Sequence, residues 1–128
     1  MENFYLIHSC KEYKFRVYLN SSNSDVMKKF NQINRNEKTV KKFVLVIEAV
    51  KVNVANKSQW NWEARCEMGD IYAIKVDNHR FYTLVCKNHG YRELYISRYG
   101  RKQTNTNDKK LLSAINSISK ITIKKQLQ

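Results

Sequence analysis

The sequence predicts an α+β domain in which an antiparallel β-meander packs one face against helices. Three observations lead to this fold class. From residue 70 onward, apolar residues recur with a period of two, which is typical of β-strands. Between residues 24 and 54 they recur at spacings of three and four, which is typical of amphipathic helices. A last helical segment follows the strands, and 128 residues suit a single domain, residues 1–128.

The N-terminal part begins with two strand-like segments, residues 3–10 and 13–19, which are rich in aromatic and β-branched side chains. They can form a hairpin or one long bent strand. A run of Asn, Ser and Asp then offers caps for a first helix over residues 24–33. A second helix is expected over residues 37–54. Its apolar face consists of five residues at helical spacing: Val40, Phe43, Val44, Ile47 and Val50.

Residues 56–70 are expected to form a loop that contains Trp60 and Trp62. If this segment is extended, the two rings lie on one side of it. We interpret them as caps on the hydrophobic core. Base stacking is the alternative interpretation.

The meander itself is expected to contain three strands, over residues 71–76, 81–86 and 91–99, which are joined by two tight turns. The sequence "NTND" then caps a helix over residues 109–118. The tail that follows, residues 119–128, predicts either a short edge strand or a frayed basic end.

Alternation along the strands divides the sheet into two expected faces. On the covered face we expect seven residues to be buried together: Ile74, Leu94, Ile96, Phe43, Ile47, Leu112 and Ile115. The other face is expected to be open and to present Lys75, Tyr95, Ser97 and Tyr99. Three cations are expected where the last strand ends: Arg98, Arg101 and Lys102. Such a face suits phosphates and unpaired bases.

The charge is unevenly distributed along the chain. There are 24 Lys and Arg against 11 Asp and Glu, so the formal net charge is +13. Residues 71–128 carry 12 basic and 3 acidic side chains, a net of +9. This field attracts polyanions, which favours a nucleic acid as partner. A surface that serves solubility, or one that matches an acidic protein, is the alternative.

Several classes of function are not expected from this composition. Three cysteines with no CxxC motif do not predict a disulfide framework, and they favour a reducing cytoplasm. Cys86 and His89 have a spacing seen in zinc sites, but no second pair accompanies them, so neither a metal nor a cofactor is expected. The longest apolar run, "FVLVIEAV", is too short to span a membrane, and no signal peptide is visible. Only three acidic residues follow residue 70, so carboxylate chemistry and magnesium-dependent cleavage are not expected.

Residues 70–118 resemble the C-terminal half of RelE/ParE-type toxins of bacterial type II toxin–antitoxin systems. The resemblance rests on "DIYAIKVDNHRFYTLV" and "YRELYISRYGRKQTNTNDKKLLSAI". They are similar to a family pattern of a Tyr-x-ϕ-(Lys/Arg) strand, a turn with an arginine, and a strand that ends in a basic cluster before the last helix. The matching positions are Tyr72, Lys75, Arg80, Arg101 and Lys102. Many RNA-cutting members have a Tyr or His in or just before that helix, whereas this chain has none after Tyr99.

The resemblance implies a RelE-like fold and a toxin that cuts messenger RNA, usually on the ribosome, without a metal. The 2′-hydroxyl of the RNA would attack the adjacent phosphate. Lys75, Arg80, Arg101 and Lys102 would hold the phosphate, and His79 or Tyr99 would take part in proton transfer. Arg98, Tyr95 and Tyr99 would contact the RNA. An antitoxin protein would be the partner.

Two other functions remain open at this point. One is a non-enzymatic toxin of the same fold that binds a target such as DNA gyrase. The other is a basic nucleic-acid-binding module without toxicity. Of the remaining histidines, His8 is expected to be structural, and His89 is expected to be solvated in a turn.

Overall fold

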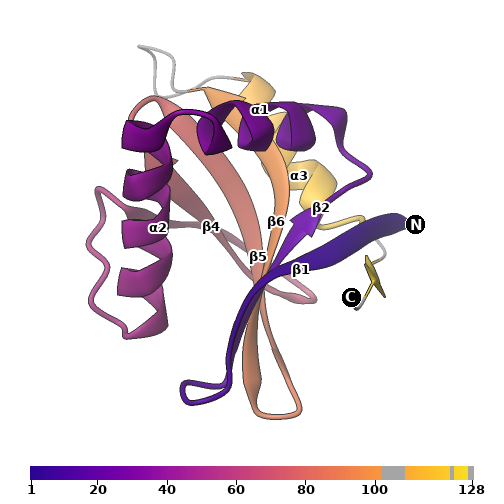
Figure 1. Cartoon of the computed structure of the whole chain (residues 1–128). Coiled ribbons are helices and arrows are strands. Elements are labelled where there is room, and N and C mark those ends of the chain that lie inside the picture. The colour runs from indigo at the N-terminus through magenta and orange to yellow at the C-terminus, as the bar shows by residue number, and fades with distance from the viewer. Residues whose placement is uncertain (102–108, 122, 127–128) are drawn as a thin grey trace.

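The computed structural model describes residues 1–101, 109–121 and 123–126, and within these ranges the chain forms seven strands and three helices (Figure 1). The predicted α+β class is therefore confirmed. In chain order the elements are β1 (Glu2–Cys10), β2 (Phe15–Asn20), α1 (Ser24–Asn34), α2 (Glu37–Lys51), β3 (Trp60–Cys66), β4 (Gly69–Val76), β5 (His79–Asn88), β6 (Tyr91–Arg101), α3 (Lys109–Ile118) and β7 (Ile123–Gln126).

All seven strands belong to one sheet, in the order β3-β4-β5-β6-β2-β1-β7. Strands β3 to β6 form an antiparallel meander, and β1 and β2 form a hairpin. This hairpin joins the meander through parallel pairing of β2 with β6. Strand β7 pairs in parallel with β1 at the edge, so the tail forms the short edge strand that was one of two expectations.

The meander has one strand more than expected. Trp60–Cys66 pairs with β4, so the prediction of a loop over residues 56–70 is wrong. This strand lies at the edge of the sheet and has a bulge between Trp62 and Ala64, and both features weaken the alternation that marks a strand in sequence. Trp60 stacks on Tyr72 with 4.5 Å between ring centroids, and it packs against the core.

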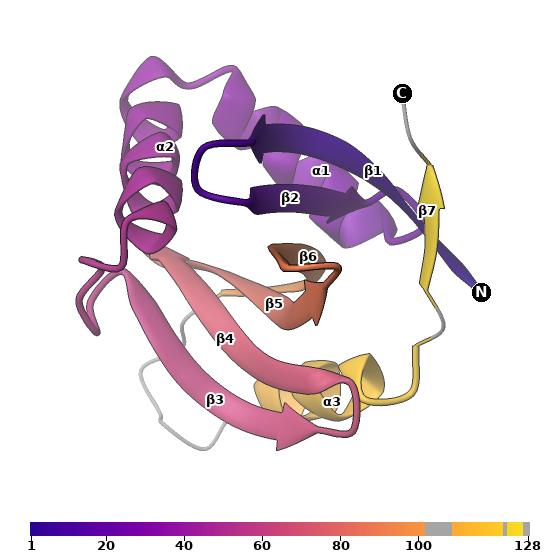
Figure 2. The ribbon, with the colours of Figure 1, turned by 90° about the horizontal axis from the view of Figure 1, so that it is seen from below.

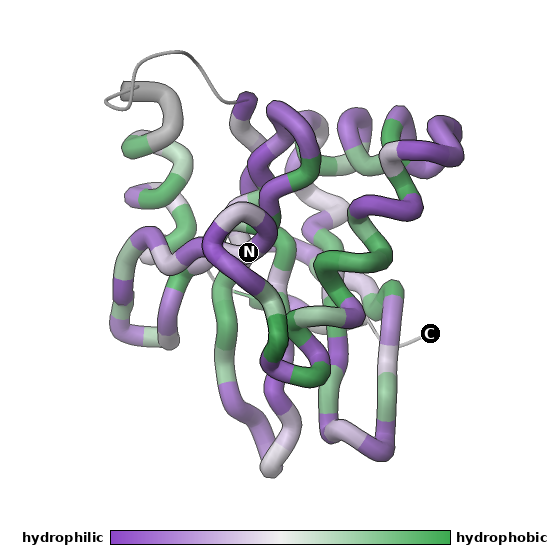
Figure 3. Tube along the Cα trace, turned by 90° about the vertical axis from the view of Figure 1, so that its left-hand side faces the viewer, coloured by the Kyte–Doolittle hydropathy of each residue, from purple (hydrophilic) through white to green (hydrophobic). Residues whose placement is uncertain are grey.

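Helices α1 and α2 cover one face of the sheet. Each begins at an asparagine cap: the side chain of Asn23 accepts from the backbone N–H of Val26, and that of Asn36 accepts from Thr39. In Figure 3 the helices alternate between hydrophobic and hydrophilic residues, as amphipathic helices do. Their inner faces close a buried cluster with the sheet, which includes Phe43, Ile47, Ile74, Leu94 and Ile96 as expected.

Helix α3 lies on the opposite face, so the prediction that helices cover only one face is wrong (Figure 2). A second buried cluster lies beneath it, and Ile118 of α3 is fully buried there. Ile115 belongs to this second cluster instead of the first, and Leu112 is 55% exposed. The reason lies in β4, whose Ile71 and Ala73 are as apolar as the residues on its other side, so both faces need cover.

A β-bulge in β6 changes which residues share a face. Tyr82 of β5 pairs with Arg98 and Thr83 pairs with Ile96, which leaves Ser97 as the extra residue. Beyond this bulge the alternation shifts by one residue. Tyr99 therefore packs against the α1–α2 core, whereas Arg98 points to α3.

The expected open face does not exist in the described part of the chain. Tyr95 is 2% exposed and Ser97 is fully buried, because α3 covers that side of the sheet, and Tyr95 packs in one cluster with Phe4, Tyr18 and Ile118. The Tyr95 hydroxyl donates to Glu93, 2.6 Å away, and its ring stacks on Tyr18. Burial raises the pKa of Tyr95, so its hydroxyl stays protonated. Tyr95 therefore supports the fold and offers no free surface to a base.

Candidate functional site

A histidine–tyrosine pair lies at the end of the sheet, next to the turn between β4 and β5. His79 is the first residue of β5, and Tyr99 lies near the end of β6. His79 Nδ1 lies 2.5 Å from the Tyr99 hydroxyl oxygen. The antiparallel register brings them together, since Phe81 pairs with Tyr99 and His79 pairs with Arg101. Both side chains are half-buried, on the face that α1 and α2 cover.

Two cations accompany this pair. Arg101 is the cross-strand neighbour of His79 and is exposed. Lys29 comes from α1, and its Nζ lies 5.6 Å from the centroid of the Tyr99 ring. Neither cation has an ion pair or a hydrogen bond with another described side chain. Two unpaired cations that converge on a polar pair favour an anion at this point.

The electrostatics of the pair follow from its burial and from these cations. Burial lowers the pKa of His79, and the positive charges of Arg101 and Lys29 lower it further, while Asp77 opposes them. Burial raises the pKa of Tyr99, against the influence of Arg101. At neutral pH the imidazole is therefore uncharged and the phenol is protonated. A neutral imidazole can accept a proton, which is what a general base requires.

The turn that carries His79 is fixed by two charged side chains. Asp77 has a left-handed backbone conformation (φ 53°), and its carboxylate lies 2.6 Å from Lys42 Nζ of α2. Hydrogen bonding to Lys42 lowers the pKa of Asp77. Arg80 donates from Nη1 to the backbone oxygens of Asp77 and His79, at 2.9 and 3.0 Å. The Arg80 guanidinium thus holds the turn, and it also lies beside the site.

The remaining residues expected from the sequence lie elsewhere. Lys75 is the cross-strand neighbour of Arg80, on the side of β4 opposite Ile74, and its Nζ donates to the backbone oxygen of Lys57 at 3.1 Å. The structure therefore does not place Lys75 beside His79 on the α1–α2 face. Lys102 lies outside the described residues.

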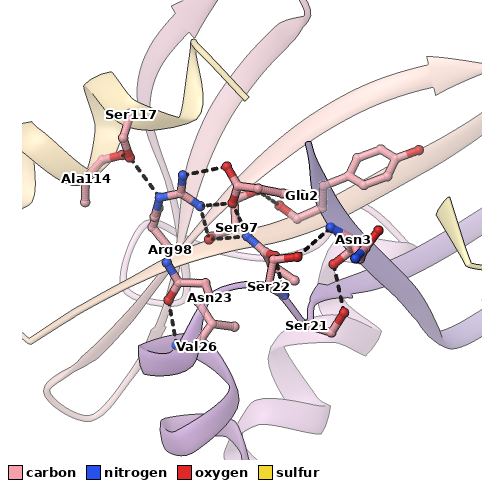
Figure 4. A network of polar contacts seen from close by, with 12 residues as sticks. Glu2, Asn3, Ser21, Ser22, Asn23, Val26, Ser97, Arg98, Ala114 and Ser117 are labelled. Carbon is pink, nitrogen blue, oxygen red and sulfur yellow. Dashed lines mark hydrogen bonds and ion pairs between the residues drawn. The ribbon is translucent and has the colours of Figure 1, made fainter. Parts of the chain in front are cut away.

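Arg98 has a structural environment, which Figure 4 shows. Its guanidinium makes a two-pronged ion pair with Glu2 of β1, with contacts of 2.6 and 2.9 Å. Its Nε donates to the Ser117 hydroxyl of α3 at 2.8 Å. This side chain therefore links β6 to the N-terminal strand and to the last helix. The expected RNA contact of Arg98 does not fit this position, because its donors are already engaged.

Sequence reasoning did not find Lys29 or Lys42, because both come from helices that are distant in sequence from the strands. Their pattern was available: each is the second lysine of a Lys-Lys pair, followed directly by a core phenylalanine. A lysine that precedes a buried residue on a helix lies at the rim of the packed face. This Lys-Lys-Phe pattern therefore predicts that both lysines lie next to the sheet, but it does not predict which strand each lysine contacts.

No family model, no curated protein and no solved structure matches this chain. In the part of the chain that the structure describes, no helix is both long and apolar enough to cross a membrane.

Proposed function

We propose that this protein is a RelE/ParE-type toxin of a type II toxin–antitoxin pair, and that it cleaves messenger RNA without a metal, on the ribosome. The observation that carries the proposal is the His79–Tyr99 pair beside the unpaired cations Lys29 and Arg101. The order of elements also supports a RelE-like fold, with a hairpin, a helix pair, an antiparallel meander and a last helix.

The proposed reaction is an internal transfer at one phosphate of the RNA. The 2′-oxygen attacks the adjacent phosphorus, and the bond from phosphorus to the 5′-oxygen breaks. The products are a 2′,3′-cyclic phosphate and a free 5′-hydroxyl. One proton leaves the 2′-hydroxyl and one proton reaches the departing 5′-oxygen, so no redox partner or further reactant is needed. The protein supplies a base, an acid and charge stabilisation.

His79 is the proposed base. When His79 Nδ1–H donates to the Tyr99 oxygen, Nε2 keeps a free lone pair that can accept the proton of the 2′-hydroxyl. The imidazolium that forms can then return a proton to the 5′-oxygen. Tyr99 orients the ring, and Arg101 and Lys29 bind the non-bridging phosphate oxygens as negative charge builds up.

The proposed partners follow from the net positive charge of the chain and from the proposed toxin–antitoxin pair. Messenger RNA and ribosomal RNA are polyanions that suit a chain with a net charge of +13. An antitoxin protein with an acidic or amphipathic segment would cover the basic end of the sheet and keep the site closed. Association should be fast and sensitive to salt. The cytoplasm is the proposed location, since translation takes place there.

The test is induced expression with mapping of messenger RNA 5′ ends, together with cleavage of a messenger RNA by the purified protein with and without added ribosomes. His79→Gln should lower the cleavage rate by about 10²–10⁴-fold, the usual contribution of a general base. Arg101→Ala should abolish growth arrest and leave thermal stability nearly unchanged. Arg65→Gln is the matched control, because Arg65 is exposed and lies on β3, where it neighbours Asp70.

The outcomes separate the competing functions. Growth arrest without RNA cleavage, unaffected by His79→Gln, supports the non-enzymatic toxin. RNA binding without growth arrest supports the nucleic-acid-binding module. Cleavage that survives both His79→Gln and Arg101→Ala places the active site elsewhere.

A further inference from the structure

Two hairpin turns lie side by side at the end of the sheet opposite His79 (Figure 1). One comprises residues 11–14 and joins β1 to β2, and the other comprises residues 89–90 and joins β5 to β6. We call these two turns, together with Lys87 near the end of β5, the hairpin tips. Strand β5 begins at His79 and ends at Asn88, so at about 3.3 Å per residue the tips lie roughly 30 Å from the candidate site.

The hairpin tips carry an excess of positive charge. Lys11, Lys14 and Lys87 are all exposed. None of these three side chains forms an ion pair or a hydrogen bond with another described residue. Glu12 is the one acidic residue in the two turns. Unpaired cations that gather at one end of the molecule attract an anionic partner to that end.

The fold holds the two tips in a fixed arrangement. The backbone N–H of Arg92 in β6 donates to the backbone oxygen of Lys14 at 2.8 Å. The Arg16 guanidinium of β2 lies 3.8 Å from the centroid of the Tyr91 ring in β6. Arg92 is also the cross-strand neighbour of Lys87, so the backbones of Lys14 and Lys87 lie about two strand spacings, roughly 10 Å, apart. Cations that are already in place lose little freedom when an anion binds.

The chemistry of the hairpin tips suits a phosphate backbone better than a protein surface or unpaired bases. Lysine binds phosphate as a point charge, without selecting a sequence. A protein interface is usually centred on apolar side chains, and Tyr13 is the one exposed large apolar residue in the two turns. A single exposed ring also offers little stacking to a row of bases. An RNA helix, whose bases are paired and whose phosphates face outward, fits both observations.

We propose that the hairpin tips bind the phosphate backbone of a ribosomal RNA helix, while the His79 end of the sheet meets messenger RNA. This inference rests on the proposed function, because that function brings the protein to the ribosome. The molecule then has two RNA contacts of different kinds, one that reacts with a single strand and one that holds a double helix. The hairpin tips supply affinity and orientation, and they take no part in the cleavage step.

The test compares two triple variants of the full chain, both in a His79→Gln background that prevents the proposed cleavage. The hairpin-tip variant combines Lys11→Gln, Lys14→Gln and Lys87→Gln. The matched control combines Lys38→Gln, Lys57→Gln and Lys120→Gln, because these lysines are exposed, lie outside the hairpin tips and remove the same charge. Binding to an RNA duplex of about 16 base pairs and to purified ribosomes is measured over a series of KCl concentrations.

The salt dependence of binding gives the expected result. The slope of log binding constant against log salt concentration should become less steep by about 2–3 in the hairpin-tip variant, because each phosphate contact contributes about 0.9. The control should change this slope by less than about 1 and should keep ribosome binding. Equal losses in the two triple variants would overturn the proposal, since net charge alone would then explain binding. A loss on ribosomes without a loss on the duplex would also overturn it, and would indicate a ribosomal protein as the partner. Cleavage is not measured in this test, so a protein without nuclease activity would contradict the proposed function and leave this result intact.

Discussion

The ion pair between Arg98 and Glu2 should contribute measurably to stability, because both of its partners are largely buried. The two side chains are only 16% and 23% exposed, and their contacts measure 2.6 and 2.9 Å. Removing one partner of a buried pair typically costs 3–5 kcal/mol, and partial exposure reduces this, so we expect about 2–3 kcal/mol for Arg98→Met. Asn20 continues to donate to Glu2, at 2.7 Å, which keeps the loss at this level. For a domain of this size, the melting temperature should fall by roughly 7–12 °C.

The assay is urea unfolding and thermal unfolding of Arg98→Met, Glu2→Gln and the double variant. The double-mutant cycle isolates the pair from the hydrogen bond between Arg98 and Ser117. The hydrogen bond from Arg98 lowers the pKa of Glu2 below its ordinary value of 4.5. A depressed folded-state pKa stabilises the protein above the unfolded value, and this stabilisation is lost as the pH falls through the folded value. The difference between wild type and Glu2→Gln should therefore shrink below about pH 4.5.

An Arg98→Met variant that unfolds at the wild-type urea concentration but binds RNA more weakly would contradict a structural role for this ion pair. That result would support the RNA contact of Arg98 that was predicted from the sequence. A loss of stability without any coupling to Glu2 would assign the effect to the bond with Ser117 instead.

Three further predictions follow from local geometry. The cleavage rate should rise with pH through the lowered pKa of His79 and level off by neutrality. Arg101→Gln should raise the pKa of His79, followed by NMR titration of the imidazole, because it removes a cation that disfavours the imidazolium. An unchanged pKa would argue against their proximity. Gly69→Ala should lower the free energy of unfolding in urea by about 1–3 kcal/mol, because Gly69 has a φ of +152° and an added Cβ would overlap a backbone carbonyl of β5. Wild-type stability of this variant would contradict the close approach of the two strands. Ile118→Ala should lower the free energy of unfolding by about 2–5 kcal/mol, because Ile118 is fully buried. Leu112→Ala should lower it by less than about 1 kcal/mol, because Leu112 is 55% exposed. Equal losses would mean that α3 packs differently.

The sequence predicted the elements whose periodicity is unbroken. Helix α2 begins at Glu37 as expected, and Phe43, Ile47 and Val50 of its expected apolar face pack in the core, whereas Val44 is 50% exposed, so its place on that face was predicted wrongly. It ends at Lys51, three residues before the expected end, where the Arg92 side chain donates to the backbone oxygens of Val50 and Lys51. That end depends on a strand far away in sequence, so local pattern could not locate it.

The burial of the second face of the sheet, which α3 covers, was harder to predict from the sequence. Tyr18, Tyr95 and Glu93 look like surface residues in sequence, but they form one buried polar cluster. Their burial depends on β2 pairing in parallel with β6, which brings Tyr18 against Tyr95 with 5.0 Å between ring centroids. Polar residues on one face of a strand indicate exposure only when nothing else lies over that face. The predicted meander had three strands, and the N-terminal strand segments were not predicted to pair with it, so such cover was not expected.

The composition of the candidate site depends on the bulge at Ser97. Without this extra residue, simple alternation would turn Tyr99 toward α3 and Arg98 toward the helix pair. The fold stabilises the bulge, because the backbone oxygen of Ser97 accepts from Asn20 at 3.0 Å and from Arg98 at 2.8 Å. The same irregularity therefore directs Arg98 into a structural ion pair and brings Tyr99 to His79. The residue that supports the fold and the residue that serves the proposed chemistry are neighbours in sequence, and a single inserted residue assigns each to its face.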